Sequence, residues 1–154
     1  MPAAALAEAP IYRHGESLQP WQRSFVTTFM KHRDLYGKAR LLLADEVGLG
    51  KTLSLGACAM MSSLLKDGPV LILCPSTLVL QWQAELRDKL GIPSAVWLSS
   101  QKVWVDSSGH LIKTRGAEDI LRCPYQIAIV STGMVFQDTK ERTLLMEGKY
   151  GTVI

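Results

Sequence analysis

The segment Gly48-Leu49-Gly50-Lys51-Thr52 constrains the fold of this chain more than any other stretch. A short apolar run, "ARLLLAD", precedes it, and a helical stretch follows from residue 51 to residue 66. A glycine loop between a strand and a helix lets backbone N–H groups and the helix N-terminus surround phosphates. Glycines allow close backbone approach, the lysine ammonium meets the β- and γ-phosphates, and the threonine hydroxyl ligates Mg²⁺. The segment therefore predicts a nucleotide phosphate site, with an ordinary glycine turn before a helix as the alternative.

Two acids precede this loop. Asp45 stands where the strict phosphate-loop pattern has a further glycine, so the loop is a variant of that pattern. Asp45 and Glu46 come so shortly before the loop that they belong to the end of the strand. From there, they are poorly placed to reach past the β-phosphate to an attacking water. We interpret both acids as loop-shaping residues and not as the groups that perform hydrolysis.

Apolar runs and amphipathic helices alternate along the rest of the chain. We expect helices at 18–32, 78–91 and 140–148, and strands at 69–75, 93–99, 125–131 and 150–154. The alternation predicts an α/β fold with a mainly parallel sheet flanked by helices. The segment 102–114 departs from this order, because alternating apolar residues flank Asp106-Ser107-Ser108-Gly109. We interpret it as a hairpin excursion from the sheet.

The composition is that of one globular domain, at 154 residues with 47% hydrophobic content. We expect a flexible arm at 1–16 and a single domain at 17–154. The net charge of +3 permits a nucleic-acid partner without requiring one. Three scattered cysteines fit neither a disulfide framework nor a zinc site, and no apolar run is long enough to span a membrane. The opening residues also lack the features of a secretory signal, so we expect a reducing cytoplasmic location and no membrane partner.

Four segments in order resemble one known family. They are "LQPWQ" from residue 18, "ADEVGLGKT" from residue 44, "CPSTLVLQWQAEL" from residue 74 and "IVSTGMV" from residue 129. Together they resemble the Swi/Snf-type ATPases of helicase superfamily two, and in particular its bacterial members. The resemblance covers about 18–154. It implies a RecA-like P-loop NTPase lobe, the first of two such lobes in the parent chain.

The resemblance also implies roles for individual residues. Gln22 would bind the adenine edge, and a polar residue on an amphipathic helix is the alternative. Ser76 and Thr77 would face nucleic-acid backbone, with an N-cap role as the alternative. Ser131 and Thr132 would form a second nucleic-acid contact. The residues implied to bind ATP are completed by Gly48, Leu49, Gly50, Lys51 and Thr52, of which Lys51 is catalytic and Thr52 ligates Mg²⁺.

The implied function is ATP hydrolysis coupled to movement on duplex DNA, with ATP and Mg²⁺ as cofactors and a larger complex among the expected partners. In the family, the acidic Mg²⁺-binding box follows a strand such as "YGTVI", so we expect the chain to be truncated before that box. The hypothesis that follows is a fragment that binds nucleotide weakly and does not hydrolyse it. The alternatives are an RNA helicase, disfavoured by the missing "TREL" segment, a restriction or defence translocase, and a non-catalytic interaction module.

Overall fold

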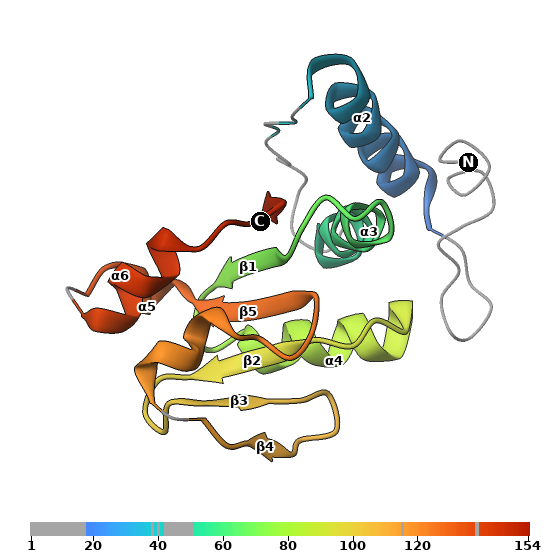
Figure 1. The fold of residues 1–154 in the computed structure, drawn as a ribbon. Coiled ribbons are helices and arrows are strands. Elements are labelled where there is room, and N and C mark those ends of the chain that lie inside the picture. Colours follow the sequence, from blue (N-terminus) through green and yellow to red (C-terminus); the bar gives the residue numbers. More distant parts are fainter. Residues whose placement is uncertain (1–17, 38, 40, 42–50, 115, 138) are drawn as a thin grey trace.

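The computed structural model describes residues 18–37, 39, 41, 51–114, 116–137 and 139–154. Its centre is a six-stranded sheet in the order β4-β3-β2-β5-β1-β6 (Figure 1). The strands β2, β5, β1 and β6 run parallel to one another. Strand β3 pairs antiparallel with β2, and β4 pairs antiparallel with β3. This confirms the mainly parallel α/β sheet. The strands are β1 Val70–Cys74, β2 Ala95–Leu98, β3 Val103–Val105, β4 Leu111–Ile112, β5 Ile127–Ser131 and β6 Thr152–Val153.

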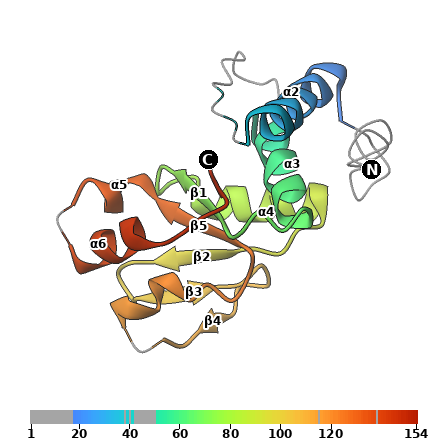
Figure 2. The same ribbon diagram turned by 45° about the horizontal axis from the view of Figure 1, so that its top comes forward.

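Helices cover both faces of the sheet. They are α2 Pro20–Tyr36, α3 Lys51–Leu64, α4 Val79–Leu90, α5 Thr132–Val135 and α6 Lys140–Glu147, with a 3₁₀ helix, η1, at Ala117–Leu121. Alternate residues of β1 point to opposite faces, because side chains alternate along a strand. Val70 and Ile72 pack with α3 and α4, whereas Leu71 packs with residues of η1, α5 and α6. Figure 2 shows α5 next to α6, on the other side of the molecule from α2.

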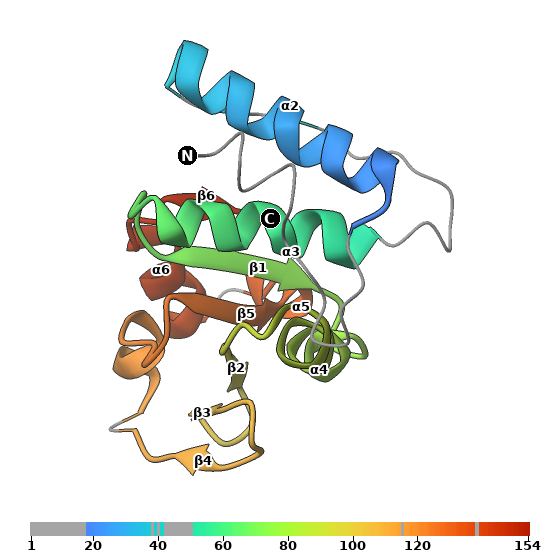
Figure 3. The same cartoon turned by 90° about the vertical axis from the view of Figure 1, so that its right-hand side faces the viewer.

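The helix α2 forms an outer layer. Its buried residues Val26 and Met30 pack against Leu53, Ala57 and Met61 of α3, so α3 lies between α2 and the sheet (Figure 3). The helix begins at Pro20, two residues after the expected start at residue 18, because proline is favoured in the first turn. It ends at Gly37 in a left-handed conformation with φ 71°.

The hairpin at 102–114 is present, but it is not an excursion from the sheet. Strand β3 pairs with β2 through Trp97 and Trp104, and β4 pairs with β3. Both strands therefore extend the sheet at one edge. The sequence could show that two strands turn back on each other, but not which neighbour the first of them joins.

The structure differs from the other sequence expectations mainly at element ends. The helix α3 ends at Leu64, two residues before the expected end, and Lys66 adopts a φ of 58°. The expected terminal strand is short, since β6 spans Thr152–Val153, although Ile154 N still donates to Leu71 O at 2.8 Å. The arm at 1–16 and most of the strand before the glycine loop lie outside the described residues. No helix in the described ranges is long and apolar enough to cross a bilayer.

Candidate nucleotide and nucleic-acid site

Six of the predicted binding residues, Lys51, Thr52, Ser76, Thr77, Ser131 and Thr132, lie at one end of the sheet. β2, β5 and β1 are neighbouring parallel strands, and Cys74 at the end of β1 is in register with Ser131 at the end of β5. Their carboxyl ends therefore meet at one edge, which is where open α/β sheets bind ligands. The helix α3 begins on the same side (Figure 3).

The phosphate loop is described only from its last two residues. Lys51 and Thr52 are the first residues of α3, and both are partly buried. An ammonium and a hydroxyl at a helix N-terminus are suited to bind phosphate oxygens and a phosphate-bound cation. Gly48, Leu49 and Gly50 lie outside the described residues, as do Asp45 and Glu46.

Ser76 and Thr77 lie in the exposed turn between β1 and α4. The N-cap of α4 is Leu78, whose side chain forms no capping hydrogen bond. The alternative interpretation of Ser76 or Thr77 as a helix cap is therefore wrong. Both residues are placed where they are accessible to a ligand beyond the end of β1.

Ser131 and Thr132 occupy the corresponding place after β5. Ser131 is the last residue of β5 and the N-cap of α5, without a side-chain capping bond, and Thr132 begins the helix. Ser76 and Ser131 both line a pocket of about 630 Å³. The structure thus brings one residue of each predicted nucleic-acid pair into a common pocket.

The same pocket contains a cluster that sequence analysis missed: Trp97, Lys102 and Glu141. The Glu141 side chain is only 7% exposed, and both of its oxygens accept hydrogen bonds. Trp97 Nε1 donates to Oε2 at 2.9 Å, and Lys102 Nζ donates to Oε1 at 2.7 Å. These groups come from β2, the turn after it and α6, so the cluster ties three elements together at the pocket.

The electrostatics of this cluster keep Glu141 ionised. Burial alone would raise the pKa of the Glu141 carboxyl, but the hydrogen bonds from Lys102, Trp97 and Ser99 outweigh it and lower the pKa. Trp97 also packs edge-to-face on Trp104, with ring centroids 5.1 Å apart, and both residues are buried. The sequence gives no signal that Trp97 also hydrogen-bonds Glu141, because the two residues are 44 positions apart.

Gln22 lies away from this pocket, on the first turn of α2. Its side chain is buried and its Oε1 accepts a hydrogen bond from Gln19 N at 2.8 Å. The Gln19 side chain in turn accepts from the backbone of Gln22, forming a capping box. Gln22 is therefore a buried capping residue at the start of this helix. Its role at the adenine edge stays a prediction.

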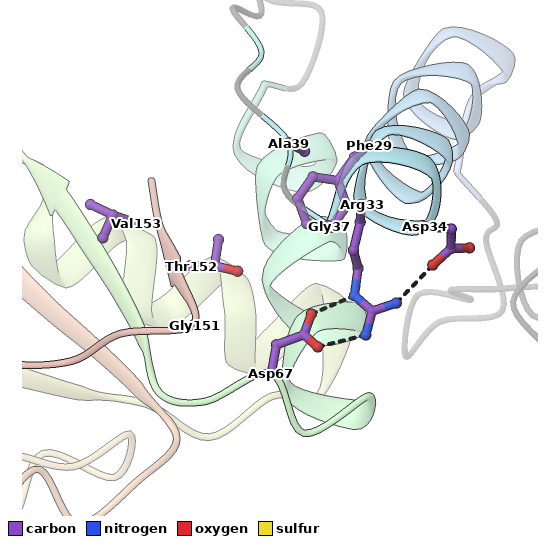
Figure 4. Close-up of a pocket in the computed structure, with 9 residues that line it drawn as sticks. All are labelled: Phe29, Arg33, Asp34, Gly37, Ala39, Asp67, Gly151, Thr152 and Val153. Carbon is purple, nitrogen blue, oxygen red and sulfur yellow. Dashed lines mark hydrogen bonds and ion pairs between the residues drawn. The ribbon is translucent and has the colours of Figure 1, made fainter.

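A second pocket, of about 660 Å³, lies between the end of α2 and the segment that forms β6 (Figure 4). Arg33 and Asp67, whose side chains pair directly with each other, both line it. None of the predicted site residues that the structure describes lines this pocket. We confine the candidate site to the carboxyl ends of the parallel strands, where the described site residues Lys51, Thr52, Ser76 and Ser131 lie.

Comparison with known proteins agrees with this architecture. The family model of the SNF2-related domain matches residues 21–152. The uncharacterized ATP-dependent helicase YqhH of Bacillus subtilis is 33% identical over 143 residues, which are 87% of this chain and 24% of YqhH. The RNA polymerase-associated protein RapA of Pseudomonas putida is 30% identical over 116 residues, 75% of this chain and 11% of RapA. The chain thus spans about a quarter or less of the length of these relatives.

A solved structure shares the fold. The Sulfolobus solfataricus SWI2/SNF2 ATPase core in complex with dsDNA superimposes with a TM-score of 0.67 over 94% of this chain and 27% of that chain. The sequences are 22% identical, so the likeness establishes the fold, and it confirms the expected RecA-like lobe. Because the family model extends over most of the chain, from residue 21 to residue 152, the chain belongs to the SNF2-related domain family.

Proposed function

We propose that this chain forms the ATP-binding part of the first RecA-like lobe of an ATPase that moves along duplex DNA. One observation carries the proposal. The start of α3, with Lys51 and Thr52, lies at the same sheet edge as the residues that follow β1 and β5. A nucleotide-phosphate site and a nucleic-acid surface would then share one rigid edge. The names of the relatives support the same class, since YqhH is called an ATP-dependent helicase.

The proposed roles follow from the chemistry of each side chain. Lys51 places a positive charge on the β- and γ-phosphates of ATP, and Thr52 supplies a hydroxyl ligand for Mg²⁺. The fit rests on the partly buried position of Thr52 in the first turn of α3. Mg²⁺, when bound, neutralises charge on the phosphates. Ser76, Thr77, Ser131 and Thr132 bind backbone phosphates of one DNA strand, which position the duplex without selecting its sequence.

Nucleotide binding by the 154-residue chain tests the first half of this proposal. We expect calorimetry to detect Mg²⁺-dependent ATP binding that Lys51→Ala abolishes. The matched control is Lys89→Ala, an exposed lysine near the end of α4, at the opposite edge of the sheet. We expect no phosphate release from this chain alone. Equal ATP binding by wild type and Lys51→Ala would contradict the nucleotide site.

Phosphate release tests the second half. The chain, together with any residues that its gene encodes beyond residue 154, is assayed with duplex DNA and with single-stranded RNA. We expect duplex DNA to give the stronger stimulation. Preferential stimulation by RNA would favour an RNA helicase, and a melting temperature that ATP does not raise would favour a non-catalytic module.

A further inference from the structure

We propose that Lys102 is a phosphate-contacting residue for duplex DNA, and that Glu141 is the positioning residue that holds its ammonium at the pocket. The inference rests on the proposed function and adds to the four hydroxyl residues a cation from a different part of the chain. Lys102 lies in the turn after β2, which is the third parallel strand ending at this sheet edge.

The backbone of Lys102 is fixed on both sides. Its N–H donates to Leu98 O at 2.7 Å, and its carbonyl accepts from the hydroxyl of Thr114 in the returning arm of the hairpin. Its φ of 54° lies in the left-handed region, which side chains other than glycine, asparagine and aspartate enter uncommonly. Because two hydrogen bonds hold this backbone conformation, the Lys102 side chain extends from the turn in one fixed direction.

The side chain of Lys102 is held by a buried anchor. Glu141 is 7% exposed and Lys102 is 52% exposed, so the ion pair runs from the interior toward solvent. The indole N–H of Trp97 donates a hydrogen bond to the second carboxylate oxygen of Glu141 and fixes the orientation of this carboxylate. An ammonium has three N–H donors, and Glu141 accepts one of them. Donors therefore remain for a phosphate oxygen, in a geometry that requires little ordering on binding.

The other groups at the pocket suit a phosphodiester. Among the described residues that line it, the charged ones are Lys102 and Glu141, and both Glu141 oxygens already accept hydrogen bonds from the protein. Of these two described side chains, Lys102 carries the exposed charge and Glu141 is buried. The hydroxyl residues Ser76 and Ser131 line the same pocket. A cation with nearby hydroxyls is the usual set of donors for nucleic-acid backbone.

A purely structural ion pair, which only fastens α6 to the turn after β2, is the competing explanation. It predicts that Lys102 affects stability and leaves the salt dependence of DNA binding unchanged. Our proposal predicts instead that Lys102 changes the salt dependence of DNA binding. Each phosphate contact releases condensed counterions, which changes the slope of log K against log salt by about 0.9 for duplex DNA.

The test measures binding of a fluorescent duplex to the 154-residue chain over a series of salt concentrations. We expect Lys102→Ala to make the salt slope shallower by about 0.9 for any duplex sequence, and Lys102→Arg to retain it. Lys89→Ala is the control and should retain the wild-type slope. An equal slope in Lys102→Ala and Lys89→Ala would overturn the role of Lys102 and leave the proposed function standing. No binding of duplex by the wild type at low salt would overturn both.

A second readout is made on the wild-type chain, so it does not depend on the folding of a Lys102 variant. The Trp97 indole N–H resonance, assigned by its absence in Trp97→Phe, reports on the carboxylate of Glu141. If Lys102 contacts a phosphate, the charge next to Glu141 changes, and the resonance should shift on addition of duplex to the wild-type chain. A resonance that stays in place while the duplex binds would overturn the proposal.

Discussion

Arg33 of α2 and Asp67, in the turn after α3, form a two-point ion pair (Figure 4). Arg33 Nε donates to Asp67 Oδ2 and Nη2 donates to Oδ1, each at 2.6 Å. The hydrogen bonds to Asp67 raise the pKa of Arg33 above its ordinary value. The two side chains are 28% and 23% exposed, so the pair is partly shielded from water. It ties the C-terminal end of the outer helix to the layer beneath it.

Asp67→Asn should therefore lower the free energy of unfolding by about 1–2 kcal/mol, because a two-point charged pair is reduced to one neutral acceptor. Asp34→Asn is the matched control. Asp34 also bonds Arg33, at 2.8 Å, but it is 54% exposed, and such pairs contribute about 0–1 kcal/mol. Urea denaturation measures both. Equal losses in the two variants would show that the geometry of the Asp67 pair adds nothing.

Gly151 permits the close approach of the chain before β6 to the turn before β1. A Cβ at this position would lie 2.8 Å from Gly68 N and closer still to the carbonyl of Asp67. We expect Gly151→Ala to destabilise the protein by about 2 kcal/mol, since backbone atoms must move to accept it. Gly109→Ala, in the open tip of the hairpin with φ 85°, should cost about 1 kcal/mol through backbone strain alone. Thermal unfolding that ranks Gly109→Ala as the costlier change would contradict this account.

Local signals account for the parts of the fold that sequence analysis located well. Proline in the first turn marks the start of α2, and Gly91 ends α4 with φ 68°. These features depend on neighbours in the chain, so they can be predicted without knowing the tertiary structure. The order of the predicted site motifs also placed Ser76 and Ser131 at strand ends, and the structure brings both to one pocket.

Contacts between distant residues could not be predicted. Arg33 lies near the end of α2, and its partner Asp67 lies 34 residues further along the chain. Glu141 lies 39 residues from Lys102, and nothing in its helix distinguishes it from a surface acid. The edge pairing of the hairpin depends on the sheet order β3-β2-β5-β1, which no local pattern encodes. Tertiary packing decides each of these features.

Gln83 joins α4 to the sheet by side-chain bonds to two carbonyls. Its Nε2 donates to Ser94 O at 3.0 Å and to Val105 O at 2.9 Å, and the residue is 5% exposed. Gln83→Leu should lower the free energy of unfolding by about 1–3 kcal/mol, because two buried carbonyls lose a donor. Gln81→Leu, on the exposed face of the same helix, should change it by less than about 0.5 kcal/mol. Guanidinium denaturation compares them, and a neutral Gln83→Leu would show that the bridge is dispensable.

Glu141 should make the stability of the protein depend on pH in the acid range. Its pKa is lowered in the folded state, despite burial, by hydrogen bonds from Lys102, Trp97 and Ser99. The folded state then holds fewer protons than the unfolded state, so stability rises with pH through this range. The contribution is complete above the unfolded pKa of about 4.3, and it is lost as pH falls through the folded pKa.

Glu141→Gln removes this titration, so its free energy of unfolding should approach that of the wild type as the pH falls below about 4. Lys102→Met removes the donor that most lowers the pKa of Glu141, so burial should raise the folded pKa towards or above the unfolded value, and the rise of stability with pH should shrink or reverse. Thr143→Ala, an exposed change on α6 without a titratable group, should not alter the slope. Urea titrations at a series of pH values measure all three. A constant gap between wild type and Glu141→Gln across this range would mean that Lys102 and Trp97 do not hold Glu141 in its charged form.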